Sequence, residues 1–167
     1  KGKEMGVLAP HKSPWWNEIP DWAKDPEGYW TAQYQGTIAF IVNTKKAAQA
    51  VYHLCRGHPY AAVFHLSTSM CPAHRKARLD EIRHRLDANP PLPTLCISTQ
   101  LIEAGVDVDF GSVIRYTAGL DSIAQAAGRC NRNGRAEQGR VHVVNPCPGD
   151  ENLDKLPDIR IGRDRAE

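Results

Sequence analysis

Short apolar runs alternate with segments of helical periodicity from Thr37 to about Asn145, and this alternation is the main structural signal of the chain. The apolar runs are typical of buried strands, which we expect at 37–42, 60–66, 94–98, 112–117 and 140–145. Strands that alternate with helices form a mostly parallel sheet with helices on both faces. The pattern therefore predicts an α/β domain built as a three-layer sandwich.

The segments between these strands carry the start signals of helices. Asn43 or Thr44 is placed to cap a first helix. Its inward positions follow at helical spacing, at Ala47, Ala48, Val51, Leu54 and Cys55. Pro72 opens a second helix, whose inner face would hold Leu79, Ile82 and Leu86. A third helix is expected near Ile123.

The two ends of the chain differ in composition from this central part, so we divide the chain at 1–35, 36–146 and 147–167. The first segment is rich in Trp and Pro and is expected to pack on the core as a lid or connection. Stacking of its tryptophans on nucleic-acid bases is the weaker interpretation. The last segment is charged and is expected to be a polar tail. Because the chain starts at Lys1 rather than Met, we expect a fragment of a longer protein.

Composition adds little about function but excludes some classes. A chain of 167 residues with 41% hydrophobic content can bury one core, and a formal charge of +2 is too small to indicate nucleic acid. Five cysteines without a C-x-x-C pair argue against zinc and favour a reduced, cytoplasmic setting. No apolar run is long enough to cross a bilayer, so no membrane partner is expected.

The most informative segment is Q-A-A-G-R-C-N-R-N-G-R at 125–135. Arg129 and Arg132 are three residues apart, a spacing that lets two guanidinium groups on one helical turn reach the same phosphate. On arginine count alone, a solvated basic turn would be the better interpretation. A second segment shifts the balance, S-T-Q-L-I-E-A-G-V-D-V-D-F at 98–110.

Together these segments resemble motifs V and VI of superfamily 2 helicases. I-V-N-T-K-K-A at 41–47 and H-L-S-T-S-M-C-P-A-H-R at 65–75 add weaker support, and the four blocks occur in the expected order. Among these helicases, the motifs are most similar to those of the second RecA-like domain of the CRISPR-associated helicase-nuclease of type I systems. The resemblance implies a RecA-like sandwich that works with ATP and Mg²⁺.

The resemblance also implies roles for individual residues. Arg129 and Arg132 match arginine fingers for the γ-phosphate, and Gln125 matches the residue that positions that phosphate or the attacking water. The alternative for Gln125 is a purely structural role, in a capping box with Ser122. Arg135 has a weaker case as a finger and is expected to pair with an acid of the same lobe.

The second motif is expected to form a hinge beside the nucleotide. Gly105 would let the backbone approach closely, and Asp107 matches a carboxylate that accepts a bond from a ribose hydroxyl or from an arginine finger. The sequence has no phosphate loop, and the Asp80-Glu81 pair lies in a charged helix rather than after a buried strand. The phosphate loop and the metal ligands are therefore expected on a separate first RecA-like lobe.

Polar residues that follow the predicted strands are candidates for contacts to a nucleic-acid backbone. They are Asn43, Thr44, Lys45, Ser67, Thr68, Arg75 and Thr99. Helix capping explains the first two nearly as well. Ligands of such sheets gather at the carboxyl ends of the strands, where we expect the motif loops to lie. Phosphate contacts of this kind predict binding that tolerates any base sequence and weakens with salt.

The resemblance implies the second motor lobe of an ATP-dependent 3′ to 5′ DNA helicase or translocase in type I CRISPR interference. Implied partners are single-stranded DNA, the first lobe and a His-Asp nuclease domain of the same protein, and the CRISPR RNA-guided surveillance complex. Two alternatives stay open. One is a lobe of another superfamily 2 DNA or RNA helicase, and the other is a non-catalytic docking module. The chain alone is expected to be inactive.

Overall fold

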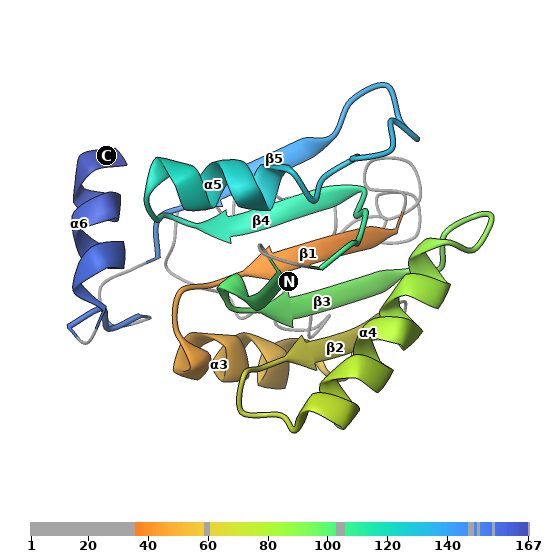
Figure 1. Cartoon of the computed structure of the whole chain (residues 1–167), viewed down its shortest axis with the longest axis horizontal. Helices are drawn as coiled ribbons and strands as arrows, with labels where there is room; N and C mark the ends of the chain where they lie inside the picture. The colour runs from red at the N-terminus through yellow and green to blue at the C-terminus, as the bar shows by residue number, and fades with distance from the viewer. Residues whose placement is uncertain are drawn as a thin grey trace.

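The computed structural model describes residues 36–58, 61–102, 106–146, 149, 151–154 and 156–166. Predictions on the segment 1–35 and on Gly105 lie outside these residues. Five parallel strands form one sheet in the order β2-β3-β1-β4-β5 (Figure 1). The strands are β1 (Thr37–Ile41), β2 (Ala62–Leu66), β3 (Thr94–Ser98), β4 (Ser112–Tyr116) and β5 (Arg140–Val144).

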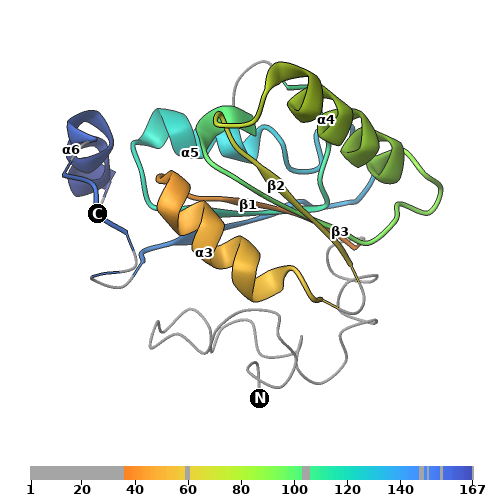
Figure 2. The ribbon, with the colours of Figure 1, turned by 90° about the horizontal axis from the view of Figure 1, so that it is seen from below.

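Helices cover both faces of this sheet. The helical elements of the described residues are α3 (Lys45–Cys55), α4 (Pro72–Leu86), the 3₁₀ turn η4 (Gln100–Ile102), α5 (Leu120–Ala127) and α6 (Pro157–Ala166). Figure 2 shows α3 on one face and α4 with α5 on the other. The predicted three-layer α/β sandwich is confirmed.

The three central strands carry two separate hydrophobic cores because successive side chains point to opposite faces. One core lies under α3 and includes Ile38, Phe40 and Ile97. The other lies under α4 and α5 and includes Ala39, Ile41 and Cys96. Burial on both faces explains why these strands read as continuous apolar runs in the sequence. The inward face of α3 was predicted correctly except for Leu54, which is 39% exposed.

Local sequence signals account for where the helices begin. Thr44 caps α3, its Oγ1 accepting the N–H of Ala47 at 3.1 Å, which decides between the two cap candidates. Pro72 occupies the first turn of α4, as expected. The cap of α5 is Gly119, so the alternative interpretation of Gln125, a capping box with Ser122, is wrong. Ser122 lies inside the helix instead.

The segment after β5 contains structure that its polar composition did not predict. Leu153 is buried, and α6 follows it and packs beside the start of α5 (Figure 1). A Cβ atom at Gly162 would lie 2.8 Å from the Cα of Gly119, so the close approach of these two elements requires glycine. Within the described part of the chain, no helix is long and apolar enough to cross a membrane.

Candidate functional site

The carboxyl edge of the sheet gathers most of the predicted nucleic-acid contacts. Thr44 and Lys45 follow β1, Ser67 and Thr68 follow β2, and Thr99 follows β3. Because these strands are neighbours in the order β2-β3-β1, their loops lie side by side. Arg75 is half-buried in the first turns of α4, the helix that leaves this edge after β2.

One hydrogen bond joins the loops after β1 and β2, and a second lies within the loop after β2. The Nζ of Lys45 donates to the Oγ of Ser69 at 3.2 Å, and the Oγ of Ser67 accepts the N–H of Ser69 at 3.2 Å. Lys45 and Thr68 are exposed, whereas Ser67 and Thr99 are largely buried. The edge therefore offers an exposed ammonium and exposed hydroxyl groups on a fixed backbone.

A carboxylate that the sequence did not single out occupies part of this edge. The side chain of Glu151 accepts the backbone N–H groups of Asn43 at 2.8 Å and Thr44 at 2.9 Å. Its second oxygen accepts the Nδ2 of Asn43 at 2.7 Å. The two amides at the start of α3 are thus already bonded to an anion of the same chain. A glutamate in a polar segment gives no sequence signal of such a contact.

Asn43 belongs to a buried network rather than to the exposed surface. It is only 4% exposed, and its Oδ1 accepts the guanidinium of Arg115 at 2.6 Å. Arg115 is fully buried in β4 and also donates to the carbonyl of Tyr116 and to the Oγ of Ser122, both at 2.9 Å. The side chain of Asn43 is therefore directed into this network, and its role as a nucleic-acid contact stays a prediction. The sequence did carry one signal of this network, because an arginine interrupts the otherwise apolar run S-V-I-R-Y.

The arginine segment lies near the opposite end of the sheet. The carbonyl of Arg129 accepts the N–H of Phe110 at 2.9 Å, and Phe110 precedes the first residue of β4 by two positions. The backbone of the segment therefore lies near the amino end of β4, because α5 runs back from the carboxyl edge. The expectation that all motif loops meet at the carboxyl edge is wrong for this segment.

The guanidinium groups of the segment have distinct partners. The Nε of Arg129 donates to the carbonyl of Ile102 at 3.1 Å, which directs this side chain towards η4. Arg132 pairs with Asp107 at 2.7 Å, and the two side chains are 47% and 85% exposed. Asp107 thus accepts a bond from an arginine, one of the two bonds that the sequence suggested for it. Gln125 is exposed on α5.

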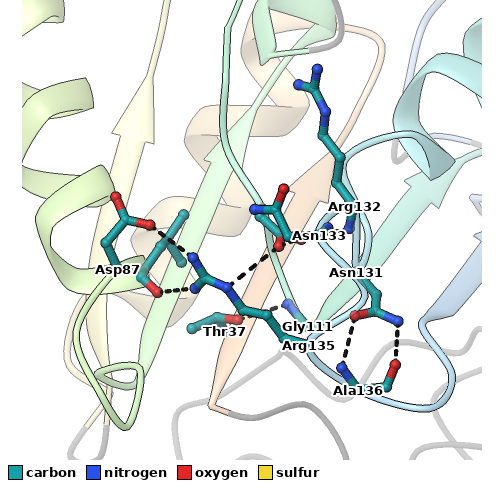
Figure 3. A network of polar contacts seen from close by, with 10 residues as sticks. Thr37, Asp87, Gly111, Asn131, Arg132, Asn133, Arg135 and Ala136 are labelled. Carbon is teal, nitrogen blue, oxygen red and sulfur yellow. Dashed lines mark hydrogen bonds and ion pairs between the residues drawn. The ribbon is translucent and has the colours of Figure 1, made fainter.

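Arg135 pairs with acids of its own lobe, as predicted. It contacts Asp87 at the end of α4 at 3.0 Å and Asp109 at 3.7 Å. Figure 3 shows this contact network, with the side chain of Arg132 directed away from it. The sequence did not single out Asp109, whose side chain is only 8% exposed.

The described residues offer no cluster of three or more His, Cys, Asp or Glu side chains that could hold a metal ion. Burial raises the pKa of Cys96 to about 12, and burial together with the charge of Asp109 raises that of Cys130 to about 11. Both thiols stay protonated at neutral pH. The arginine, lysine, amide and hydroxyl groups of the site all suit phosphate.

A parallel five-stranded sheet with helices on both faces, followed after α5 by a basic turn, defines the chain as a RecA-like α/β domain. A family model described as "CRISPR-associated nuclease/helicase Cas3, C-terminal" matches residues 34–135. The chain belongs to this family.

Individual relatives agree with this assignment. The CRISPR-associated nuclease/helicase Cas3 of Haloferax volcanii is 62% identical over 42 residues, covering 25% of this chain and 4% of the relative. That of Methanothermobacter thermautotrophicus is 31% identical over 100 residues, covering 60% and 12%. The chain thus spans a small part of the curated relatives that it matches.

Solved structures show the same fold. T. fusca Cas3 with ATP has a TM-score of 0.61 at 21% identity, covering 76% of this chain and 16% of that one. A CRISPR-associated protein has a TM-score of 0.59 at 25% identity, covering 85% and 17%.

Proposed function

We propose that this chain is the second motor lobe of an ATP-dependent, 3′ to 5′ single-stranded DNA translocase within a full-length CRISPR helicase-nuclease. One observation carries the proposal. Within the region matched by the family model, Arg132 presents a half-exposed guanidinium whose partner, Asp107, is an exposed carboxylate. An exposed ion pair contributes little net stability, so the guanidinium can exchange this carboxylate for a phosphate at small cost.

The nucleotide would be shared between two lobes. The first RecA-like lobe would hold the phosphates of ATP and the Mg²⁺ ion, which supplies charge neutralisation when bound. Arg132 and Arg129 would then reach the γ-phosphate across the cleft and stabilise the negative charge that develops as the bond breaks. The bond from Arg129 to the carbonyl of Ile102 fixes the direction of that side chain in advance. Gln125 and Gly105 are proposed to line the same cleft.

The DNA strand would cross the carboxyl edge, where the loops after β1, β2 and β3 lie side by side. Lys45 and Thr68 are exposed there, and Thr44, Ser67, Thr99 and Arg75 complete the proposed contacts. Because Glu151 already accepts the amides of Asn43 and Thr44, we assign the phosphate contacts of this loop to side chains. Such contacts read no base sequence. The grip therefore suits a translocase that moves over any sequence.

Family membership supports the remaining parts of the proposal. The family is named for a nuclease/helicase, and one structural neighbour, with a TM-score of 0.56 at 23% identity, is a CRISPR RNA-guided surveillance complex before nicking. We propose that the full-length protein contains a His-Asp nuclease domain, works in the cytoplasm and acts on DNA delivered by such a complex.

The proposal is tested by ATP turnover of the full-length protein with saturating single-stranded DNA. Substituting Arg129→Gln or Arg132→Gln is expected to lower kcat by about 10³-fold or more, by analogy with other arginine fingers. Arg140→Gln is the matched control, since Arg140 is an exposed arginine at the start of β5. Turnover that survives both finger substitutions would refute the assignment. Stimulation by RNA and not by DNA would instead indicate a different superfamily 2 helicase.

A further inference from the structure

The turn that carries Arg132 is built around the carboxylate of Asp109. One oxygen of Asp109 accepts the backbone N–H of Arg132 at 2.7 Å, and the other accepts the N–H of Asn133 at 3.1 Å. This side chain is 8% exposed, whereas the side chain of Arg132 is 47% exposed. The carboxylate therefore holds the backbone of Arg132 and leaves its guanidinium outside.

Arg135 fastens the same turn to the end of α4. Its Nη1 donates to the carbonyl of Leu86 at 2.7 Å, its Nη2 bonds to Asp87 at 3.0 Å, and its Nε lies 3.7 Å from Asp109 (Figure 3). A cation at the carboxyl end of a helix also interacts favourably with the helix dipole. Arg135 therefore joins three segments that are distant in sequence.

The side chain of Asn131 also stabilises this turn, by two hydrogen bonds to the backbone of Ala136. Its Nδ2 donates to the carbonyl of Ala136 at 2.8 Å, and its Oδ1 accepts the N–H of Ala136 at 3.0 Å. Asn131 has a φ of 47°, a left-handed conformation that asparagine tolerates better than most residues. The turn is therefore fixed from its start to its end before any phosphate is bound.

We infer that Asp109 and Arg135 are positioning residues, which hold the backbone of Arg132 so that its guanidinium can move between Asp107 and a phosphate. This inference rests on the proposed function, because it assigns the fixed turn to phosphate binding by Arg132. A charged group that must meet a transferring phosphate is effective only when little ordering remains for the moment of reaction. Anchoring through the backbone supplies that order without occupying the guanidinium.

The first experiment measures amide hydrogen exchange by NMR on the 167-residue chain and needs no nucleotide. Asp109→Asn keeps the size of the side chain but removes its charge and one acceptor. Loss of a hydrogen bond to a charged group should speed exchange at the N–H of Arg132 or Asn133 by about tenfold or more. Amides of β1 should keep their wild-type rates, which separates loosening of the turn from unfolding.

Glu137→Gln is the matched control for this measurement. It removes one exposed carboxylate two residues after Arg135 and should leave both amides unchanged. Unchanged exchange at both amides in Asp109→Asn would overturn the inference. A uniform increase over the whole chain would also overturn it, because Asp109 would then support the fold rather than the turn.

The second experiment measures ATP turnover by the full-length protein carrying Asp109→Asn or Arg135→Gln. Misplacing a group at a reaction centre by about 1 Å can cost about 10²-fold, so kcat should fall by about 10- to 100-fold while KM for ATP changes by less than about threefold. Arg135→Lys should recover part of the loss in kcat, since lysine keeps the positive charge but lacks the planar guanidinium with its paired donors. Glu137→Gln should match wild type.

The outcomes separate the inference from the proposed function. If Arg132→Gln abolishes turnover while Asp109→Asn and Arg135→Gln leave it intact, the arginine finger stands and the positioning role is overturned. If exchange at the turn speeds up while neither Arg132→Gln nor Asp109→Asn affects turnover, the proposed function is overturned, and the inference that rests on it falls too. Parallel loss in all three variants supports both.

Discussion

Replacement of Arg115 by methionine is expected to destabilise the domain by about 2–4 kcal/mol. The guanidinium is fully buried and donates to Asn43, Tyr116 and Ser122 at 2.6–2.9 Å. Methionine has a similar length but leaves these three acceptors without that donor, and an unsatisfied buried acceptor costs about 1–3 kcal/mol. Relief from burying a charge offsets part of this loss, because buried ion networks carry a large desolvation penalty.

Urea unfolding of the 167-residue chain at neutral pH measures this change directly. The expected loss corresponds to a fall in Tm of roughly 4–16 °C for a chain of this size. Arg115→Lys should lie between wild type and Arg115→Met, because lysine keeps the charge without the planar fork.

A double-mutant cycle with Asn43→Ala tests whether the bond itself is responsible. Residues that share one buried hydrogen bond should show a coupling energy of about 0.5–3 kcal/mol. A stability of Arg115→Met within about 0.5 kcal/mol of wild type would refute the reasoning. So would strictly additive effects of the two substitutions, since the network would then be energetically irrelevant.

Three further predictions concern activity, binding and titration. The purified 167-residue chain should show no ATP turnover, and hydrolysis by a contaminant-free sample would contradict the division of the site between two lobes. Lys45→Gln should weaken binding of the full-length protein to oligo-dT and to mixed-sequence DNA equally. It should also reduce the magnitude of the slope of log K against the logarithm of the salt concentration by about one. Weaker binding to only one of the two DNA sequences would refute a contact to phosphate alone. Burial raises the pKa of Cys55 and Cys96 from 9.0 to about 12, so their contribution to stability is complete below pH 9 and is lost as pH rises towards 12. Iodoacetamide at pH 8 should therefore label the exposed Cys71 before the buried Cys55 and Cys96, and early labelling of Cys96 would contradict its burial.

The fold was predictable because the central strands are buried on both faces. Every residue of β1, β3 and β4 is buried, and apart from Arg115 these positions hold apolar, aromatic or small polar residues, which the sequence shows as apolar runs. Strong local signals fixed the starts of α3 and α4. By contrast, α6 carries alternating charges and little apolar content. Its position depends on a close contact between Gly119 and Gly162, which no periodicity reveals.

The residue types of the candidate site were predictable, but only some of the partners of these residues were. The spacing of Arg129 and Arg132 identified the basic turn, and strand ends identified the loops at the carboxyl edge. The contacts of Glu151 and Asp109 join residues 108 and 23 positions apart, and a lone carboxylate carries no sign of such a partner. The placement of the arginine turn also required the structure, because the short α5 returns the chain to the amino end of β4.

The most direct test of the central proposal is trapping of a transition-state analogue. The full-length protein should bind ADP with aluminium fluoride in the presence of Mg²⁺ and single-stranded DNA, because the analogue mimics the phosphoryl group in transfer. Arg132→Gln should weaken this binding by about 10²-fold or more, while ADP alone should bind with an affinity close to that of wild type. Equally tight trapping by wild type and Arg132→Gln would contradict the account, since the guanidinium of Arg132 would then not reach the phosphate.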